Sequence, residues 1–261
     1  MRVEILSGAK YSMTAARWLR AMAIALDESG ETVIRTSQYV GDAETLLLFG
    51  VGADAHDRAR RIHLASGRRV VHFDMGYFGD RKSNVRICID EDHPQRWLEA
   101  TPPKVMRWVQ QGIDLRNDAK ARGPIVLIGL GKKSRSYLNL PHWEAQKLEA
   151  LKAEFPGREI IYRPKTRVDV ELGLPVDATT PIAELLTGAS LVVCRHSNCA
   201  VDAVIAGIPF RAEDGAAMWL QGKDFTPANR LDFLRRLAYW QYSVHEAPQA
   251  WAFAKRMMKC V

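Results

Sequence analysis

The sequence predicts an α/β protein made of two Rossmann-like domains, each a doubly wound parallel sheet with helices on both faces. Short apolar segments of strand length alternate with longer segments of helical periodicity along both halves of the chain. Some of these apolar segments lack the polar alternation of a strand with one face in water, which is typical of strands buried in a parallel sheet. The length of 261 residues suits two domains of ordinary size.

The first half contains the elements of one such domain. Strands are expected at residues 3–6, 32–36, 45–49 and 69–73, with a further candidate at 84–89, and helices at residues 11–26 and 57–66. Two adjacent prolines, Pro102 and Pro103, interrupt a helical pattern, and a charged connection follows at residues 114–122. We therefore expect the first domain to cover residues 1–115.

The second half repeats the alternation. Strands are expected at residues 124–128, 158–162, 191–194 and 210–214, and helices at 142–155, at 181–186 and after residue 198. Thr180 is suited to cap the middle helix, with Pro181 as its first residue. The second domain is expected to cover residues 116–225, and the aromatic-rich segment 226–261 to form helices, separated at Pro248, that bridge the domains.

The stretch from residue 189 to residue 214 is predicted to form a strand, a tight turn, a helix and a second strand. Ser197 or Asn198 is suited to cap the helix, and Gly207 to end it. The turn places Arg195, His196 and the two cap candidates at a helix N-terminus, where backbone amides and the helix dipole attract an anion. We interpret it as a phosphate-binding turn. An ordinary polar cap, with a structural hydrogen bond for His196, is the alternative.

Further candidates follow the other strands of the second domain. Gly131, Lys132 and Lys133 come after the strand at 124–128, and Arg163 and Lys165 after the strand at 158–162. The carboxyl ends of parallel strands are where open α/β sheets bind ligands. The lysine turn lacks the spacing of a P-loop, and for Arg163 and Lys165 a solvated strand end is the alternative.

Composition narrows the range of partners and compartments. The net charge of +7 suits a polyanion such as nucleic acid, and equally a basic pocket for a nucleotide diphosphate. No apolar run reaches membrane-spanning length, and residues 1–30 lack the form of a signal peptide. The four cysteines are scattered without zinc-type spacing, which favours reduced thiols. We expect a cytoplasmic protein without a membrane span.

The second half resembles the donor-binding domain of GT-B glycosyltransferases. The resemblance is carried by the turn at residues 129–134, the strand end at 162–165, and the segment 196–203 followed by Gly207-Ile208-Pro209. Over most of the chain, the sequence is similar to GT-B-like proteins of tailed bacteriophages. The shared pieces are short: residues 74–77, 163–165, 197–203, 214–217 and 237–241. The implied fold has two Rossmann-like domains that face a cleft, with the C-terminal helices packing across.

This resemblance implies a nucleotide-sugar donor, with a UDP-sugar as the first expectation, bound by the second domain without a metal. The implied diphosphate ligands are Gly131, Lys132, Lys133, Arg163, Lys165, His196, Ser197 and Asn198, and Asp214 would accept hydrogen bonds from donor hydroxyls. The implied acceptor is a hydroxymethylated pyrimidine in double-stranded phage DNA, modified in the host cytoplasm. The alternatives are a transferase for surface polysaccharide or lipid, and an inactive nucleotide-binding or host-interaction protein.

An inverting transferase also needs a base that takes the proton of the acceptor hydroxyl. Asp74, at the carboxyl end of the strand at 69–73, is our first candidate, and an Asp that caps the next turn is the alternative. Asp54 and His56 are second choices, and Asp202 is expected to orient its neighbours.

Overall fold

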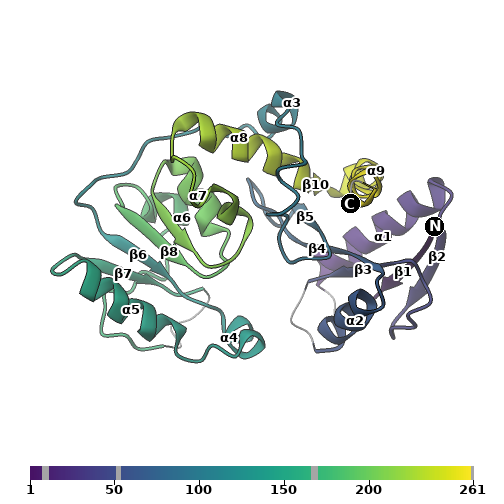
Figure 1. Ribbon diagram of the computed structural model, residues 1–261, viewed down its shortest axis with the longest axis horizontal. Coiled ribbons are helices and arrows are strands. Elements are labelled where there is room, and N and C mark those ends of the chain that lie inside the picture. Colours follow the sequence, from purple (N-terminus) through teal and green to yellow (C-terminus); the bar gives the residue numbers. More distant parts are fainter. Residues whose placement is uncertain (8–11, 51–53, 166–169, 260–261) are drawn as a thin grey trace. The chain divides into compact units, whose positions relative to one another are not determined.

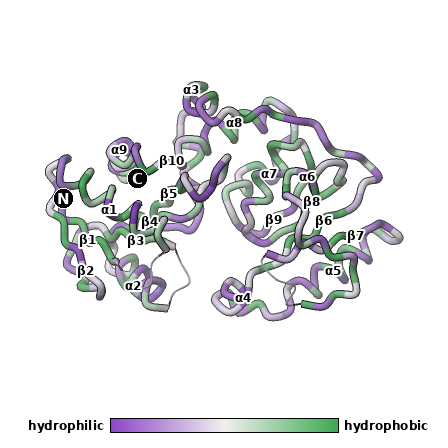
Figure 2. Tube along the Cα trace, turned by 180° about the vertical axis from the view of Figure 1, so that it is seen from behind, coloured by the Kyte–Doolittle hydropathy of each residue, from purple (hydrophilic) through white to green (hydrophobic). Residues whose placement is uncertain are grey.

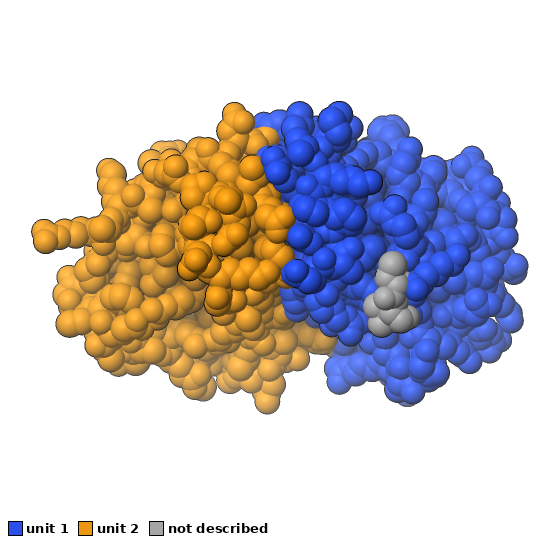
Figure 3. Space-filling model, turned by 45° about the horizontal axis from the view of Figure 1, so that its top comes forward, with its two compact units in different colours: residues 1–112, 235–261 blue, residues 113–234 orange. Residues whose placement is uncertain are grey.

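The computed structural model describes residues 1–7, 12–50, 54–165 and 170–259, which form two compact units (Figure 3). Unit 1 comprises residues 1–112 and 235–261, and unit 2 comprises residues 113–234. The chain passes from unit 1 to unit 2 after residue 112, three residues before the predicted boundary at residue 115. The chain returns to unit 1 inside helix α8 (Pro227–Leu237), within the predicted tail segment 226–261.

Unit 1 contains one six-stranded sheet in the order β10-β5-β4-β3-β1-β2 (Figure 1). Its strands are β1 (Arg2–Leu6), β2 (Thr32–Thr36), β3 (Thr45–Phe49), β4 (Arg69–Met75), β5 (Asn84–Ile89) and β10 (Gln241–Ser243). The first four are parallel, whereas β5 runs antiparallel to β4 and β10 antiparallel to β5. β5 is antiparallel because residues 76–83, which connect it to β4, are too few for the crossover that a parallel strand would need.

The central strands of unit 1 are covered on both faces. Helices α1 (Met13–Glu28) and α2 (Asp54–Ala65) both contact β3, which is buried along its whole length. Helix α9 (Ala247–Met258) packs against α1, and the short α3 (Val105–Val109) lies after the two prolines. The first predicted helix begins at Met13, because Ser12 is its cap and its hydroxyl accepts from the Ala15 amide at 3.2 Å.

Unit 2 contains a four-stranded, fully parallel sheet in the order β7-β6-β8-β9. The strands are β6 (Ile125–Ile128), β7 (Ile160–Arg163), β8 (Leu191–Cys194) and β9 (Phe210–Ala212). The hydrophobic residues, green in Figure 2, run along these strands, and β6 and β8 are buried throughout. The sheet is therefore the centre of the unit's core.

Among the described residues, the α-helices of unit 2 are α4 (Lys132–Leu138), α5 (Trp143–Glu154), α6 (Ile182–Leu185), α7 (Cys199–Ala206) and most of α8. The predicted lysine turn becomes helical from Lys132 onward. Pro181 is the cap of α6, not its first residue as predicted. Gly207 ends α7 in the left-handed conformation, at φ 73°, as a C-terminal glycine should.

Candidate functional site

The carboxyl edge of the unit 2 sheet brings most of the predicted ligand-binding residues together. From β6 the chain crosses first to β7 on one side and then to β8 on the other, so the strand order reverses between β6 and β8. At such a point the two following loops separate and leave a crevice in which doubly wound sheets bind ligands. The loops concerned contain Gly131 and the β8–α7 turn.

The β8–α7 turn is only partly covered by other residues. Residues 195–199 are all half-buried, whereas the residues on either side are buried. Of the two predicted caps, Ser197 forms a side-chain bond within the turn, because its hydroxyl accepts from the Cys199 amide at 3.2 Å. Asn198 occupies the cap position, and its side chain forms no capping hydrogen bond to the helix. One of the amides expected to face an anion, that of Cys199, is thus already engaged within the turn.

Two acidic residues after β9 fix this turn. The Arg195 carbonyl oxygen accepts from the amides of Glu213, at 3.0 Å, and Asp214, at 2.7 Å. The Arg195 guanidinium lies 3.2 Å from the Glu213 carboxylate and 3.9 Å from that of Asp214. Glu213 also accepts from the Trp143 indole, at 3.0 and 3.1 Å, and lies 2.5 Å from Lys147 Nζ. Sequence reasoning did not find Glu213, since its partners come from two other segments, helix α5 and the β8–α7 turn.

Lys165 and Gly131 meet at the same edge. Gly131 caps α4, and a Cβ atom added to it would lie 3.2 Å from Lys165 Cδ, so the exposed lysine side chain passes directly over the glycine. Lys132 and Lys133 are exposed in the first turn of α4. The three lysines therefore place cationic side chains at one end of the sheet.

Buried Glu144 holds the start of this loop. One of its carboxylate oxygens accepts from the Leu130 amide at 2.8 Å and from the Arg135 guanidinium at 2.6 Å. The Glu144 side chain is 1% exposed and that of Arg135 is 11% exposed. The carboxylate and guanidinium thus join α4, α5 and the end of β6.

Arg163 forms an ion pair with Asp177, which the sequence did not predict. Its guanidinium donates to the Asp177 carboxylate at 3.1 Å and to the Asp177 carbonyl oxygen at 3.2 Å. Hydrogen bonds from Thr180, then from the Thr179 amide and the Arg163 charge, lower the pKa of Asp177. The Arg163 charge is therefore largely balanced by the Asp177 carboxylate.

In unit 1, Asp74 lies within β4, one residue before its end. Its carboxylate is 3.0 Å from the guanidinium of Arg86, on the neighbouring strand β5, and accepts from the Met75 amide at 2.7 Å. Burial disfavours the Arg86 charge, but Asp74 and other neighbouring groups outweigh it and raise the pKa of Arg86. Asp74 is 29% exposed, so water reaches a carboxylate with a fixed cationic partner.

The remaining candidates are less informative. Asp54 begins α2, and its side chain lies outside the described residues; His56 is half-buried in the same helix. Asp202 is half-buried in α7. Cys88 and Cys194 are buried, Cys199 is half-buried, and Cys260 lies outside the described part.

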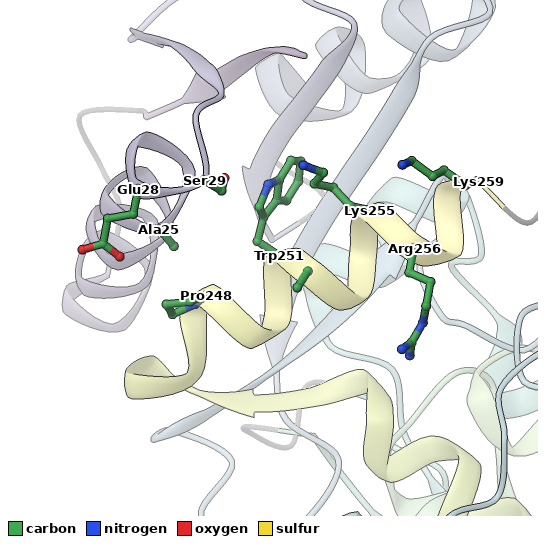
Figure 4. A pocket seen from close by; sticks show the side chains of 9 residues that line it. Ala25, Glu28, Ser29, Pro248, Trp251, Lys255, Arg256 and Lys259 are labelled. Carbon is green, nitrogen blue, oxygen red and sulfur yellow. The ribbon is translucent and has the colours of Figure 1, made fainter.

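Two of the hollows that described residues line lie on unit 1. The larger, of about 440 Å³, lies between α1 and α9 and is lined by Ala25, Trp251 and Lys255, among others (Figure 4). It contains none of the predicted residues. The smaller, of about 370 Å³, has a polar lining that includes Asp80, Asn84 and Arg107.

Within residues 1–7, 12–50, 54–165 and 170–259, no helix has the length and apolar character needed to span a bilayer. The same ranges contain no group of three or more His, Cys, Asp or Glu residues placed to hold a metal ion.

No protein-family model matches the chain, and neither does any curated protein sequence. Two solved structures of KpsC from Thermosulfurimonas dismutans are similar in fold. The beta Kdo 2,4 transferase is 13% identical, with a TM-score of 0.55 over 93% of this chain and 92% of that one. The beta Kdo 2,7 transferase is 16% identical, with a TM-score of 0.56 over 97% and 99%. The fold is GT-B-like. This confirms the predicted fold class of two Rossmann-like domains, and at such identities it shows the fold alone.

Proposed function

We propose that the protein is a glycosyltransferase that moves a sugar from a nucleotide-sugar donor to a hydroxyl group of an acceptor. The observation that carries this proposal is the carboxyl edge of the unit 2 sheet. There the half-buried turn at residues 195–198 and the Gly131 loop flank the point where the strand order reverses, and Lys165 lies over Gly131. The GT-B-like fold and the Kdo transferases that share it add support.

In this proposal the donor diphosphate binds at the edge of unit 2. As the bond between the sugar and the diphosphate breaks, negative charge accumulates on the departing phosphate oxygens, and preorganised donors lower the barrier by stabilising it. The Ser197 and Asn198 amides and the α7 dipole would supply such donors, with His196 beside them. Lys165, Lys132 and Lys133 would supply full charges, without need of a metal. Asp214 would accept hydrogen bonds from sugar or ribose hydroxyls.

The acceptor step is assigned to unit 1. The acceptor oxygen attacks the anomeric carbon, the carbon–oxygen bond to the diphosphate breaks, and the acceptor proton passes to the Asp74 carboxylate. Arg86, 3.0 Å from Asp74, favours the ionised form that can accept this proton. Attack from the side opposite the leaving group inverts the anomeric centre.

For the acceptor we propose a hydroxymethylated pyrimidine in double-stranded DNA, in the cytoplasm of a host cell. The support is the resemblance to GT-B-like phage proteins and the net charge of +7. A surface polysaccharide or lipid acceptor is the second candidate, favoured by the Kdo transferases that share the fold. DNA binding that weakens steeply with added salt supports the first candidate. Absence of DNA binding at low salt removes it.

The donor proposal is tested by thermal shift with UDP-, GDP-, CMP- and dTDP-sugars. A donor present at about 100 times its dissociation constant stabilises the protein by about 2.7 kcal/mol. Lys165→Ala should weaken binding about 10-fold or more, as expected for a lost charge-assisted hydrogen bond of about 1.5–3 kcal/mol. Lys152→Ala removes the same charge from an exposed position in the last turn of α5, and should leave binding unchanged. Equal effects of the two variants, or no stabilisation by any donor, would contradict the proposal.

A further inference from the structure

Two sequence motifs far apart in the chain, residues 74–77 and 237–241, meet in unit 1. Gln241 opens β10, and its side chain is almost completely buried. We propose that Gln241 is a positioning residue that holds the segment after β4, and through it the Asp74–Arg86 pair, in the geometry needed to deprotonate the acceptor. The catalytic part of this inference rests on the proposed function.

The Gln241 side chain uses both ends of its amide. Its oxygen accepts hydrogen bonds from two successive backbone amides, those of Tyr77 and Phe78, the latter at 2.8 Å. Its nitrogen donates to the Phe78 carbonyl oxygen at 3.3 Å and to the Gln111 side chain at 3.0 Å. A buried amide with four partners fixes this loop in one conformation, because each lost bond would leave a buried polar group unsatisfied.

Gly76 makes this contact possible. A Cβ atom at residue 76 would lie 2.6 Å from the Gln241 side-chain oxygen and 3.0 Å from the Asn84 carbonyl oxygen. The Gly76 amide also donates to that carbonyl at 2.9 Å. The glycine of the first motif is therefore needed for the close approach of the glutamine of the second.

The contacts continue from Gln241 to Asp74 without a gap. Gln241 is paired directly with Arg86 in the β10–β5 register, and Asp74 is paired with Arg86 in the β4–β5 register. The Arg86 guanidinium lies 5.6 Å from the centre of the Tyr77 ring, whose backbone Gln241 holds, and 3.0 Å from the Asp74 carboxylate. A shift of Tyr77 would therefore move the cation that is paired with the Asp74 carboxylate.

Gln241→Met tests the inference, because methionine has similar length but none of the hydrogen bonds. We expect kcat to fall about 10-fold or more while the donor KM stays within about twofold, since the donor is assigned to unit 2. The carboxyl carbon of Asp74, followed by NMR, should titrate at higher pH in the variant as Arg86 loosens. Ser243→Ala is the matched control. Ser243 lies in the same strand as Gln241, and its replacement breaks a capping box with Glu246. The control should therefore lower stability without removing a hydrogen bond to the segment after β4.

Amide hydrogen exchange tests the contact with Gln241 in the unmodified protein, without a substitution. The Tyr77 and Phe78 amides should exchange far more slowly than that of Lys82, which donates to the exposed Asp80 carboxylate in the same connection. Equal exchange rates overturn the inference, as does an Asp74 titration that Gln241→Met leaves unchanged. If no sugar nucleotide is turned over by the unmodified protein, the proposed function fails, while the NMR titration and exchange rates still decide whether Gln241 positions Asp74.

Discussion

Acid should destabilise unit 1 through His72, and the size of the effect follows from its surroundings. His72 lies in β4 and is completely buried, and neither of its ring nitrogens has a hydrogen-bond partner among the described residues. Burial lowers the pKa of His72 from 6.5 to about 4; Asp74 and Asp92 oppose this shift, whereas Arg86 and Arg60 add to it. The unfolded chain therefore binds a proton near pH 6.5, which the folded chain binds only near pH 4.

The pKa of His72 is lower in the folded chain than in the unfolded chain, so neutral His72 favours the folded state. This contribution to the free energy of unfolding is complete above pH 6.5 and is lost as the pH falls to about 4. At about 1.4 kcal/mol per pH unit, this loss amounts to about 3 kcal/mol. Urea unfolding of the unmodified protein and of His72→Phe, compared at pH 7 and near pH 4, isolates this group. The variant should lose about 3 kcal/mol less stability over that interval. An equal loss in both proteins would refute the reasoning.

Three substitutions test other contacts, each by urea unfolding. Glu144→Ala removes the buried carboxylate to which Arg135 donates and should cost about 3 kcal/mol or more; a cost below about 1 kcal/mol would show that this ion pair does not hold the loop. Gly76→Ala should lower the free energy of unfolding by about 1–3 kcal/mol, and by less when Gln241 is also replaced by alanine, because the added Cβ then no longer meets the Gln241 side chain. If the losses of the two substitutions are strictly additive, Gly76 and Gln241 are not in contact. Gly207→Ala combines φ 73° with a Cβ position 2.6 Å from a backbone oxygen, so it should destabilise by more than about 1 kcal/mol; an unchanged midpoint would argue against the left-handed end of α7.

The parts of the fold that could be predicted are those with a strong local signal. Residues 46–49 form an uninterrupted apolar run after Thr45, and the structure has a fully buried strand at Thr45–Phe49. The segment from β8 to β9 follows the predicted order because Gly207 and Pro209 mark the end of α7 in the sequence itself. β10 gave no such signal, since its three residues lie in a segment with helical periodicity and form a strand only by pairing with β5.

The parts of the site that lie at strand ends could be predicted from the sequence. The parts that depend on which side chains form ion pairs could not. Placing Gly131 and the β8–α7 turn at one edge required only that the second sheet be parallel. The partners of Arg163 and Asp74 could not be predicted, because each pair depends on register or on a loop returning from elsewhere. Glu213 and Glu144 resembled ordinary surface acids in the sequence, and only the folded chain shows the donors around them.

The most direct test of the central claim is an NMR titration of the isotope-labelled protein with a nucleoside diphosphate, following backbone amide shifts. If the diphosphate binds at the carboxyl edge of the second sheet, the largest shifts will come from the amides of Gly131, Ser197 and Asn198. Shifts confined to the hollow between α1 and α9, or none at saturating nucleotide, would contradict the account.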